Sequence, residues 1–170
     1  MTRAEFKQLF DQYFDAVRNY IWYRSGNPEL ASDVAQEAFL KLWEKRPYAD
    51  KTHLKGLLFK MAGDIFISNY RKQKSELKFR AAIDNGWEHL TPEETFYYKE
   101  LKVKYEKALA KMPENNRTVF LMNRMDRMKY KEIAEVTGIG IKAVEKRMSQ
   151  ALKLLKQEIQ NKSEKDTSYG

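Results

Sequence analysis

Apolar residues recur at three- and four-residue spacing along nearly the whole chain, and this is the period of an amphipathic α-helix. The pattern predicts a first helix that Gly26-Asn27-Pro28 ends, a second from Glu29 to about Lys45 that Pro47 ends, and a third from Leu54 to about Lys74. No strand-like alternation interrupts them. The apolar positions are Phe6, Leu9, Phe10, Tyr13, Val17, Tyr20 and Ile21, then Ala31, Val34, Ala35, Ala38 and Leu42, then Leu54, Leu57, Leu58, Met61 and Ile65.

A mixed stretch at 74–90 contains Asn85-Gly86 and lacks a sustained apolar stripe, so we interpret it as a linker. Thr91-Pro92-Glu93-Glu94 then predicts a helix start, with a threonine N-cap, a proline at the first helical position and a glutamate at the third. Further helices are expected at about 92–111, 113–125, 130–136 and 141–159. The sequence therefore predicts an all-α protein of two small helical domains, residues 1–74 and 92–160, joined by a flexible linker at 75–91 and followed by a polar tail at 161–170.

Charge and composition narrow the function classes. The 170 residues include 32 Lys and Arg against 24 Asp and Glu, and the formal net charge of +8 favours an acidic partner such as nucleic acid or an anionic membrane. The chain has no cysteine, which excludes disulfides, thiolate zinc sites and cysteine nucleophiles. The amino end carries no signal-peptide-like apolar run and no stretch approaches the length of a membrane span, so we expect a soluble protein of the cytoplasm.

The segment 129–155 predicts two helices joined by the turn Thr137-Gly138-Ile139-Gly140. A two-helix corner with a glycine-containing turn and a basic outer face suits insertion into the DNA major groove. The same pattern fits an ordinary helical corner whose lysines face solvent. In the second helix, the expected core stripe is Ile141, Val144, Met148, Ala151, Leu152 and Leu155, and the expected outer face is Lys142, Glu145, Lys146, Ser149 and Lys153.

The second helix of the chain carries an acidic stripe opposite its apolar face. An exposed leucine lies among the acids, and such a face can dock on a basic partner surface. The alternative is a solvated helix exterior with one stray leucine. The stripe consists of Asp33, Gln36, Glu37, Leu40 and Glu44.

The third helix offers two candidate faces, because aromatic rings lie nearly opposite its aliphatic stripe. Rings beside cations suit unpaired nucleic-acid bases, which stack on aromatic side chains while phosphates are drawn by the charge. The alternative is that the rings close the core, and this alternative applies to Phe66 in particular. The rings are Phe59, Phe66 and Tyr70, and the cations that follow are Arg71, Lys72, Lys74, Lys78 and Arg80.

Three segments together resemble, in order and spacing, regions 2 and 4 of bacterial RNA polymerase sigma factors of the extracytoplasmic-function (ECF) group. The segments are DVAQEAFLKLWEKR, LKGLLFKMAGDIFISNYRK and ALAKMPENNRTVFLMNRMDRMKYKEIAEVTGIGIKAVEKRMSQALKLLK. The resemblance covers nearly the whole chain. Glu132-Ile133-Ala134 and Val144-Glu145-Lys146-Arg147 match the family's helix-turn-helix, and the family's most specific signature is matched by Asp33, Gln36, Glu37 and Phe39.

The resemblance implies a role for each matched segment. The helix with the Asp33 signature would bind the clamp helices of the polymerase β′ subunit, and the loop Arg46 to His53 would capture a base flipped from the minus-ten element. The helix 54–74 would flank the melted strand, and the helix 141–155 would hold the minus-thirty-five element. The residues expected at the upstream element are Lys142, Lys146 and Arg147, with Glu145 and Ser149 as base readers. Arg147 borders the core stripe and has bracing the helix as its alternative role.

The linker, with Asp84, Trp87 and Glu88, would thread along the polymerase surface. The sequence departs from the family pattern at several positions. Leu57-Leu58 replace the usual Trp-Leu, Asp64 replaces Asn, Ser68 replaces Asp, and Asp64 and Ser68 bear on the minus-ten preference. In the second domain Arg127 replaces a glycine, and Gly140 and Ala143 replace the capping serine and the following threonine. Glycine is an acceptable N-cap, so the helix-turn-helix is still expected.

The function implied is therefore a sigma factor that brings core RNA polymerase to promoters, without catalysis, cofactor or small-molecule substrate of its own. Its expected partners are the polymerase (β′ clamp helices and β flap), promoter DNA and an anti-sigma factor, often membrane-anchored in this group. A helix-turn-helix regulator acting without the polymerase is the alternative, although it leaves the Asp33 stripe and the aromatic third helix unexplained. A DNA-cutting enzyme would need a catalytic cluster, and the two histidines, His53 and His89, show no metal-ligand spacing.

Overall fold

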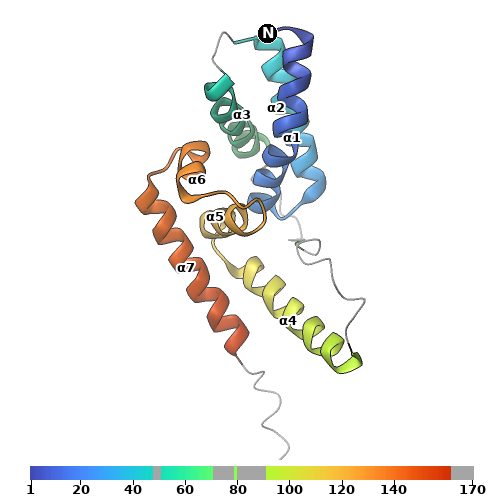
Figure 1. The fold of residues 1–170 in the computed structure, drawn as a ribbon, viewed down its shortest axis with the longest axis vertical. Helices are drawn as coiled ribbons and strands as arrows, with labels where there is room; N and C mark the ends of the chain where they lie inside the picture. Colours follow the sequence, from blue (N-terminus) through green and yellow to red (C-terminus); the bar gives the residue numbers. More distant parts are fainter. Residues whose placement is uncertain (48–50, 71–78, 80–90, 162–170) are drawn as a thin grey trace, which may run out of the picture.

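The computed structural model describes residues 1–47, 51–70, 79 and 91–161. The expectations for the linker, for Arg71, Lys72 and Lys74, and for the polar tail beyond Asn161 lie outside these residues. All elements in the described part are helical (Figure 1). They are α1 (Arg3–Ser25), α2 (Pro28–Lys45), α3 (Lys51–Ile65), the π-helical turn η1 (Phe66–Tyr70), α4 (Pro92–Lys111), α5 (Glu114–Arg124), α6 (Tyr130–Thr137) and α7 (Ile141–Gln160). We call α1–η1 the N-terminal bundle and α4–α7 the C-terminal bundle.

The turn between α1 and α2 follows the sequence signals closely. Gly26 adopts a left-handed φ of 66° and its N–H donates to the Trp22 carbonyl, which ends α1. The Asn27 side chain then accepts hydrogen bonds from the N–H groups of Glu29 and Leu30 at 3.1 Å each, and Pro28 occupies the first turn. The two helices pack against each other and support α3.

The third helix differs from the prediction at both ends. It begins at Lys51, so the last residues of the predicted loop Arg46 to His53 form its first turn. Regular α-helix ends at Ile65, and Phe66–Tyr70 form a π-helical turn, which widens the spacing of the ring-bearing positions. Leu54, Leu58 and Ile65 are buried as predicted, whereas Leu57 and Met61 are half-buried.

The C-terminal bundle begins at the predicted capping box. The Thr91 hydroxyl accepts from the Glu94 N–H at 3.2 Å, and the Glu94 carboxylate accepts from the Thr91 N–H at 2.8 Å. Between α5 and α6, Arg127 adopts a left-handed φ of 54°. This is the position where the family pattern has glycine, which adopts that conformation without steric cost. Gly138, with φ 72°, ends α6 and opens the turn into α7.

The two bundles pack directly against each other. α5 lies against α1 and α6 lies against α3, and the buried apolar residues form one continuous cluster through both bundles. In Figure 1, α5 and α6 meet the ends of α1 and α3, while α4 and α7 extend away from them. Phe79, which lies in the predicted linker, is buried at this junction: its ring stacks near Trp22 and lies 5.1 Å from the Arg117 guanidinium. The sequence did not predict that the two domains share a core.

Candidate nucleic-acid and polymerase interface

The predicted docking stripe of α2 lies on the outer face of the N-terminal bundle. Asp33, Gln36 and Glu44 are exposed, Glu37 is half-buried, and the Leu40 side chain is 56% exposed. Lys41 pairs with Glu37 at 3.0 Å along the helix. The neighbouring Phe39 points inward and packs against aromatic rings of α1. An unpartnered leucine framed by carboxylates is the arrangement that the sequence predicted here.

The predicted DNA face of α7 is also uncovered. Lys142, Glu145, Lys146 and Ser149 are exposed, and Val144, Met148 and Ala151 form the buried stripe behind them. Two predicted core residues are wrong: Ile141 is 47% and Leu152 39% exposed. Both lie at the edge of the stripe by the hundred-degree helical step, where the neighbouring helices no longer cover them.

Arg147 lies apart from the exposed cations of α7. It is half-buried, and it lines the surface against α5 near Asn115 and Asn116. The alternative role, a residue that braces α7 on the bundle, fits this position better than a contact with upstream DNA.

The aromatic rings of α3 and η1 are not available in this arrangement. Phe59 is 1% and Phe66 4% exposed, whereas Tyr70 is half-buried. The Phe59 ring packs against Tyr20, and the Arg24 guanidinium covers Phe66 at 4.9 Å from the ring centre. Both covering residues belong to α1 of the same bundle, so the expectation that these two rings face unpaired bases is not met in this structure.

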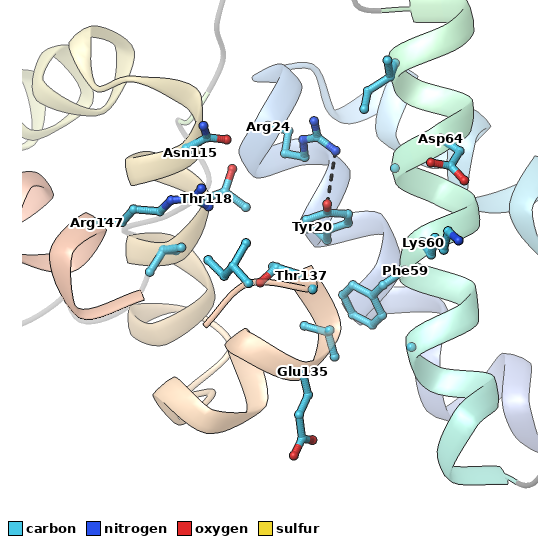
Figure 2. A pocket seen from close by; sticks show the side chains of 17 residues that line it. Tyr20, Arg24, Phe59, Lys60, Asp64, Asn115, Thr118, Glu135, Thr137 and Arg147 are labelled. Atoms are coloured by element: carbon cyan, nitrogen blue, oxygen red, sulfur yellow. Dashed lines mark hydrogen bonds between the residues drawn. The ribbon is translucent and has the colours of Figure 1, made fainter. Parts of the chain in front are cut away.

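A cleft of about 560 Å³ lies between α3 and the C-terminal bundle, next to Phe59. Figure 2 shows Phe59, Lys60 and Asp64 along the α3 wall, with Thr137 and Glu135 on the α6 side and Arg147 and Asn115 beyond. Lys60 and Asp64 are exposed, and Phe59 projects from α3 toward α1 and the end of α6. Of the three rings that the sequence analysis assigned to melted DNA, Phe59 lines this cleft, whereas Phe66 and Tyr70 do not.

Arg117 of α5 ties the bundles together. Its side chain is 4% exposed, and its guanidinium donates to the carbonyls of Tyr23 at 2.7 Å and Arg24 at 2.8 Å, the last residues of α1. The same group donates to the carbonyls of Leu109 and Met112 in its own bundle. Burial lowers the pKa of the Arg117 guanidinium, and Glu114 partly offsets this effect. A cation placed on the carbonyl end of a helix is stabilised by the helix dipole.

A second polar contact crosses the junction at Asp126, in the turn after α5. Asp126 Oδ1 accepts from the Tyr23 hydroxyl at 2.8 Å and from Asn19 Nδ2 at 3.2 Å, while Oδ2 is buried with no hydrogen-bond partner. Burial raises the pKa of the Asp126 carboxyl, against the effect of these two hydrogen bonds. Burial and the nearby Asp126 carboxylate also raise the pKa of the Tyr23 hydroxyl.

An ion pair completes the junction. Arg24 Nε donates to Glu114 Oε1 at 2.8 Å, and both side chains are largely buried, at 12% and 27% exposure. Arg24 also donates to the Tyr20 hydroxyl (Figure 2). One arginine therefore covers the Phe66 ring in the N-terminal bundle and pairs with the first turn of α5 in the C-terminal bundle.

The sequence analysis missed this junction. One signal was present: Arg117 falls in the same helical stripe as Phe120 and Leu121, at three- and four-residue spacing, so a charge lies on the apolar face of α5. Nothing in the local pattern identified its partners in α1, because these lie more than ninety residues away in the chain.

Two further features of the described residues bear on metal binding and on membrane insertion. No cluster of three or more His, Asp or Glu side chains suited to a metal ion occurs among them. Their helices also include none with the length and apolar content needed to cross a membrane.

The chain resembles known proteins along most of its length. Residues 9–76 match the family described as Sigma-70 region 2, and residues 102–155 match Sigma-70, region 4. The RNA polymerase sigma factor YlaC of Bacillus subtilis is 24% identical over 168 residues, covering 96% of this chain and 97% of YlaC. The ECF RNA polymerase sigma factor SigW of the same organism is 25% identical, covering 92% of this chain and 89% of SigW.

A solved structure shares the fold. The sigma factor RpoE from Bartonella quintana, crystallised in complex with the anti-sigma factor NepR, matches with a TM-score of 0.61 at 20% identity, over 91% of this chain and 96% of that one. The two family matches occupy the N-terminal and C-terminal bundles in the order that the motifs predicted. The chain belongs to the sigma-70 family of bacterial RNA polymerase sigma factors, in the extracytoplasmic-function group.

Proposed function

We propose that this chain directs core RNA polymerase to specific promoters, with α2 as its polymerase-docking face and α7 as its upstream DNA-reading helix. The observation that supports the assignment is that a member of this family has two uncovered helix faces, an acidic face around a leucine on α2 and a basic face on α7. α2 presents Leu40 among carboxylates, and α7 presents Lys142 and Lys146 beside Glu145 and Ser149. A leucine framed by acids suits a basic, partly apolar helix pair, and exposed lysines suit phosphates.

The minus-ten role belongs to the N-terminal bundle in this proposal. Phe59, Phe66 and Tyr70 supply the rings on which unpaired bases stack, and Arg71, Lys72 and Lys74 supply charge for the displaced strand. Because the first two rings are buried beside Tyr20 and Arg24 of α1, this role requires a rearrangement that exposes them. Residues 1–74 and 92–160 remain the proposed functional domains.

The same proposal covers catalysis, location and regulation. Sigma factors initiate transcription and leave RNA synthesis to the polymerase, so no catalytic site is assigned to this chain. Acting on the polymerase places it in the cytoplasm. An anti-sigma factor is proposed as a regulator, by likeness to the RpoE and NepR complex. A regulator that works without the polymerase is the alternative, and the leucine-centred acidic face of α2 disfavours it.

The test is a charge reversal on α2. Glu37→Lys should weaken binding to core RNA polymerase by about tenfold or more, because it places a cation against a basic partner at a half-buried position. The matched control is Asp15→Lys, which reverses an exposed carboxylate on α1. Fluorescence anisotropy titration with core enzyme from the source cell measures both, and circular dichroism checks folding. Equal affinities for the two variants would remove α2 from the polymerase interface.

A further inference from the structure

We propose that the outer face of α4 binds the same face of a second copy of this chain, which gives a weak two-fold dimer with antiparallel α4 helices. The inference does not rest on the proposed function, because it uses neither the exposed face of α2 nor that of α7. The outer face of α4 consists of the apolar residues Phe96, Val103 and Ala110 and the charged residues Lys99, Glu100, Glu106 and Lys107.

The apolar residues of the outer face form a row that faces solvent. Phe96 is 68% and Val103 49% exposed, and Ala110 is exposed as well. Each lies seven residues from the next, so all three fall within about 40° of one line along the helix. The buried positions of α4, Ala108 and Leu109, lie on the opposite half of the helix. Because α4 extends away from the N-terminal bundle (Figure 1), the row is open to a partner.

A two-fold axis through Val103 fits this row. In an antiparallel pair centred there, residues equally far before and after Val103 lie opposite one another, so Val103 meets its own copy and Phe96 meets Ala110. The largest side chain of the row thus lies against the smallest, which suits close packing. Since α4 runs from Pro92 to Lys111, the axis lies near the middle of the helix, and the two helices overlap along most of their length.

Charges flank the row in an order that complements itself. By the hundred-degree step, Glu100 and Lys107 lie on one flank of the row, whereas Lys99 and Glu106 lie on the other. With the axis through Val103, Glu100 comes within about 1.5 Å, one residue rise along the helix, of the level of Lys107 in the second copy. Lys99 comes equally near the level of Glu106 in the second copy. Symmetry repeats both pairs, so opposite charges frame the apolar row on each side.

This order of charges selects a second copy over other partners. A parallel pair would set Glu100 against Glu100 and Lys107 against Lys107, and it would also align the two helix dipoles in the same direction. A nucleic acid would meet the two carboxylates of the face, and a basic protein surface would meet its two lysines. The antiparallel copy of the same face meets each of these charges with its opposite.

The size of the face sets the strength of the dimer. A helix of 20 residues is about 30 Å long, and pairing it with its copy buries less than the roughly 1,200 Å² that marks stable specific interfaces. We therefore expect a dissociation constant on the order of 10–100 μM. Dimers of this strength form where the protein accumulates and dissociate in dilute solution.

Sedimentation equilibrium of the full chain over about 1–300 μM measures the dimer directly. Val103→Lys places two ammonium groups opposite each other at the axis, and because lysine has the higher helix propensity, the helix itself is retained. We expect the weight-average mass of the unsubstituted protein to rise with concentration toward twice the chain mass, and Val103→Lys to remain monomeric.

A charge exchange tests the register of the pair. Glu100→Lys and Lys107→Glu each create like-charged contacts at both symmetric positions, and we expect each to weaken self-association about tenfold or more. An equimolar mixture of the two variants restores opposite charges at both positions, so it should associate about as strongly as the unsubstituted protein. The matched control is Lys131→Glu, which reverses an exposed lysine of α6 outside this face and should leave self-association unchanged.

Circular dichroism checks that all variants are equally helical. A protein that stays monomeric across the whole range would overturn the proposal, and so would a dimer that neither Val103→Lys nor the single charge reversals weaken. A mixture that associates no more strongly than its components would overturn the antiparallel pairing. If the unsubstituted protein stays monomeric and Val103→Lys weakens binding to core RNA polymerase, the outer face of α4 belongs to the polymerase. That result would overturn the second-copy proposal and leave the proposed function standing.

Discussion

The two helices that this chain is proposed to lay on DNA differ in their surroundings. α7 presents Lys142 and Lys146 to solvent, whereas the rings Phe59 of α3 and Phe66 of η1 are buried beside Tyr20 and Arg24 of α1. Duplex DNA needs only an accessible basic surface, but stacking on unpaired bases needs rings that are apolar enough to prefer burial. Rings with that chemistry pack inside their own bundle when no unpaired base is present.

The largest effect that tests this contrast is on stability. Phe59→Ala should lower the free energy of unfolding by about 3–5 kcal/mol, because a buried ring leaves a cavity. Tyr70→Ala, at a half-buried position, should cost only about 1 kcal/mol. Urea unfolding followed by circular dichroism measures both. A Phe59 variant no less stable than the Tyr70 variant would show that the ring is already exposed in solution.

A test of stacking by the Phe59 ring needs a substitution that leaves the core filled. Phe59→Leu keeps apolar volume and removes the aromatic face, so the fold should persist while stacking is lost. Permanganate reactivity of promoter thymines in the open complex should fall relative to the unsubstituted holoenzyme. Normal reactivity, in a variant that still folds, would assign Phe59 to the core alone.

On α7 the expected effects are smaller and fall on binding. Lys146→Ala should cost roughly 1–3 kcal/mol at one base pair if its amine reads a guanine edge. Lys142→Ala, nearer the helix start, should weaken binding at all sequences and reduce the salt dependence by roughly 0.9 log units. Holoenzyme binding to upstream-element variants over a salt series measures both, and Lys156→Ala, exposed near the end of α7, is the control. No change in affinity, salt slope or base preference would mean that α7 is not in the groove.

The smallest expected effect is a pH dependence of the buried polar contact at Asp126. Burial raises the pKa of Asp126 in the folded protein, so the folded protein binds a proton more readily than the unfolded chain, and stability falls as pH rises through that raised pKa. Tyr23 and Asn19 of α1 donate to the carboxyl group, Tyr105 of α4 acts on Tyr23, and Arg124 of α5 acts on Tyr105. The contribution of Asp126 to the free energy of unfolding, measured with urea, should fall from acid toward neutral pH, and Asp126→Asn should remove that part of the profile. A profile that is flat in the unsubstituted protein would contradict the expectation.

Local signals in the sequence predicted local structure well. The glycine at 26, the asparagine at 27 and the Thr91 capping box fixed helix ends to within a residue or two, because each satisfies nearby backbone groups. The exposed faces of α2 and α7 were also predicted, since helical periodicity decides which positions face outward.

What the sequence could not provide was the contact between distant segments. The second apolar face of α3 was recognised, but its cover by Tyr20 and Arg24 depends on contacts with another helix, α1. The π-helical turn at Phe66–Tyr70 and the early start of α3 at Lys51 likewise reflect tertiary packing rather than local preference. Arg117 was overlooked because a charge on an apolar stripe is informative only when its partners are known.

Phe79 carries a consequence for how strong the contacts between the two bundles have to be. Residues 71–90 tether the two bundles, and docking of Phe79 beside Trp22 and Arg117 divides that tether and shortens the part that continues to Thr91. Segments joined by a short tether meet at an effective concentration on the order of millimolar. Contacts too weak to join two separate proteins at micromolar concentration therefore suffice to hold the two bundles of this chain together.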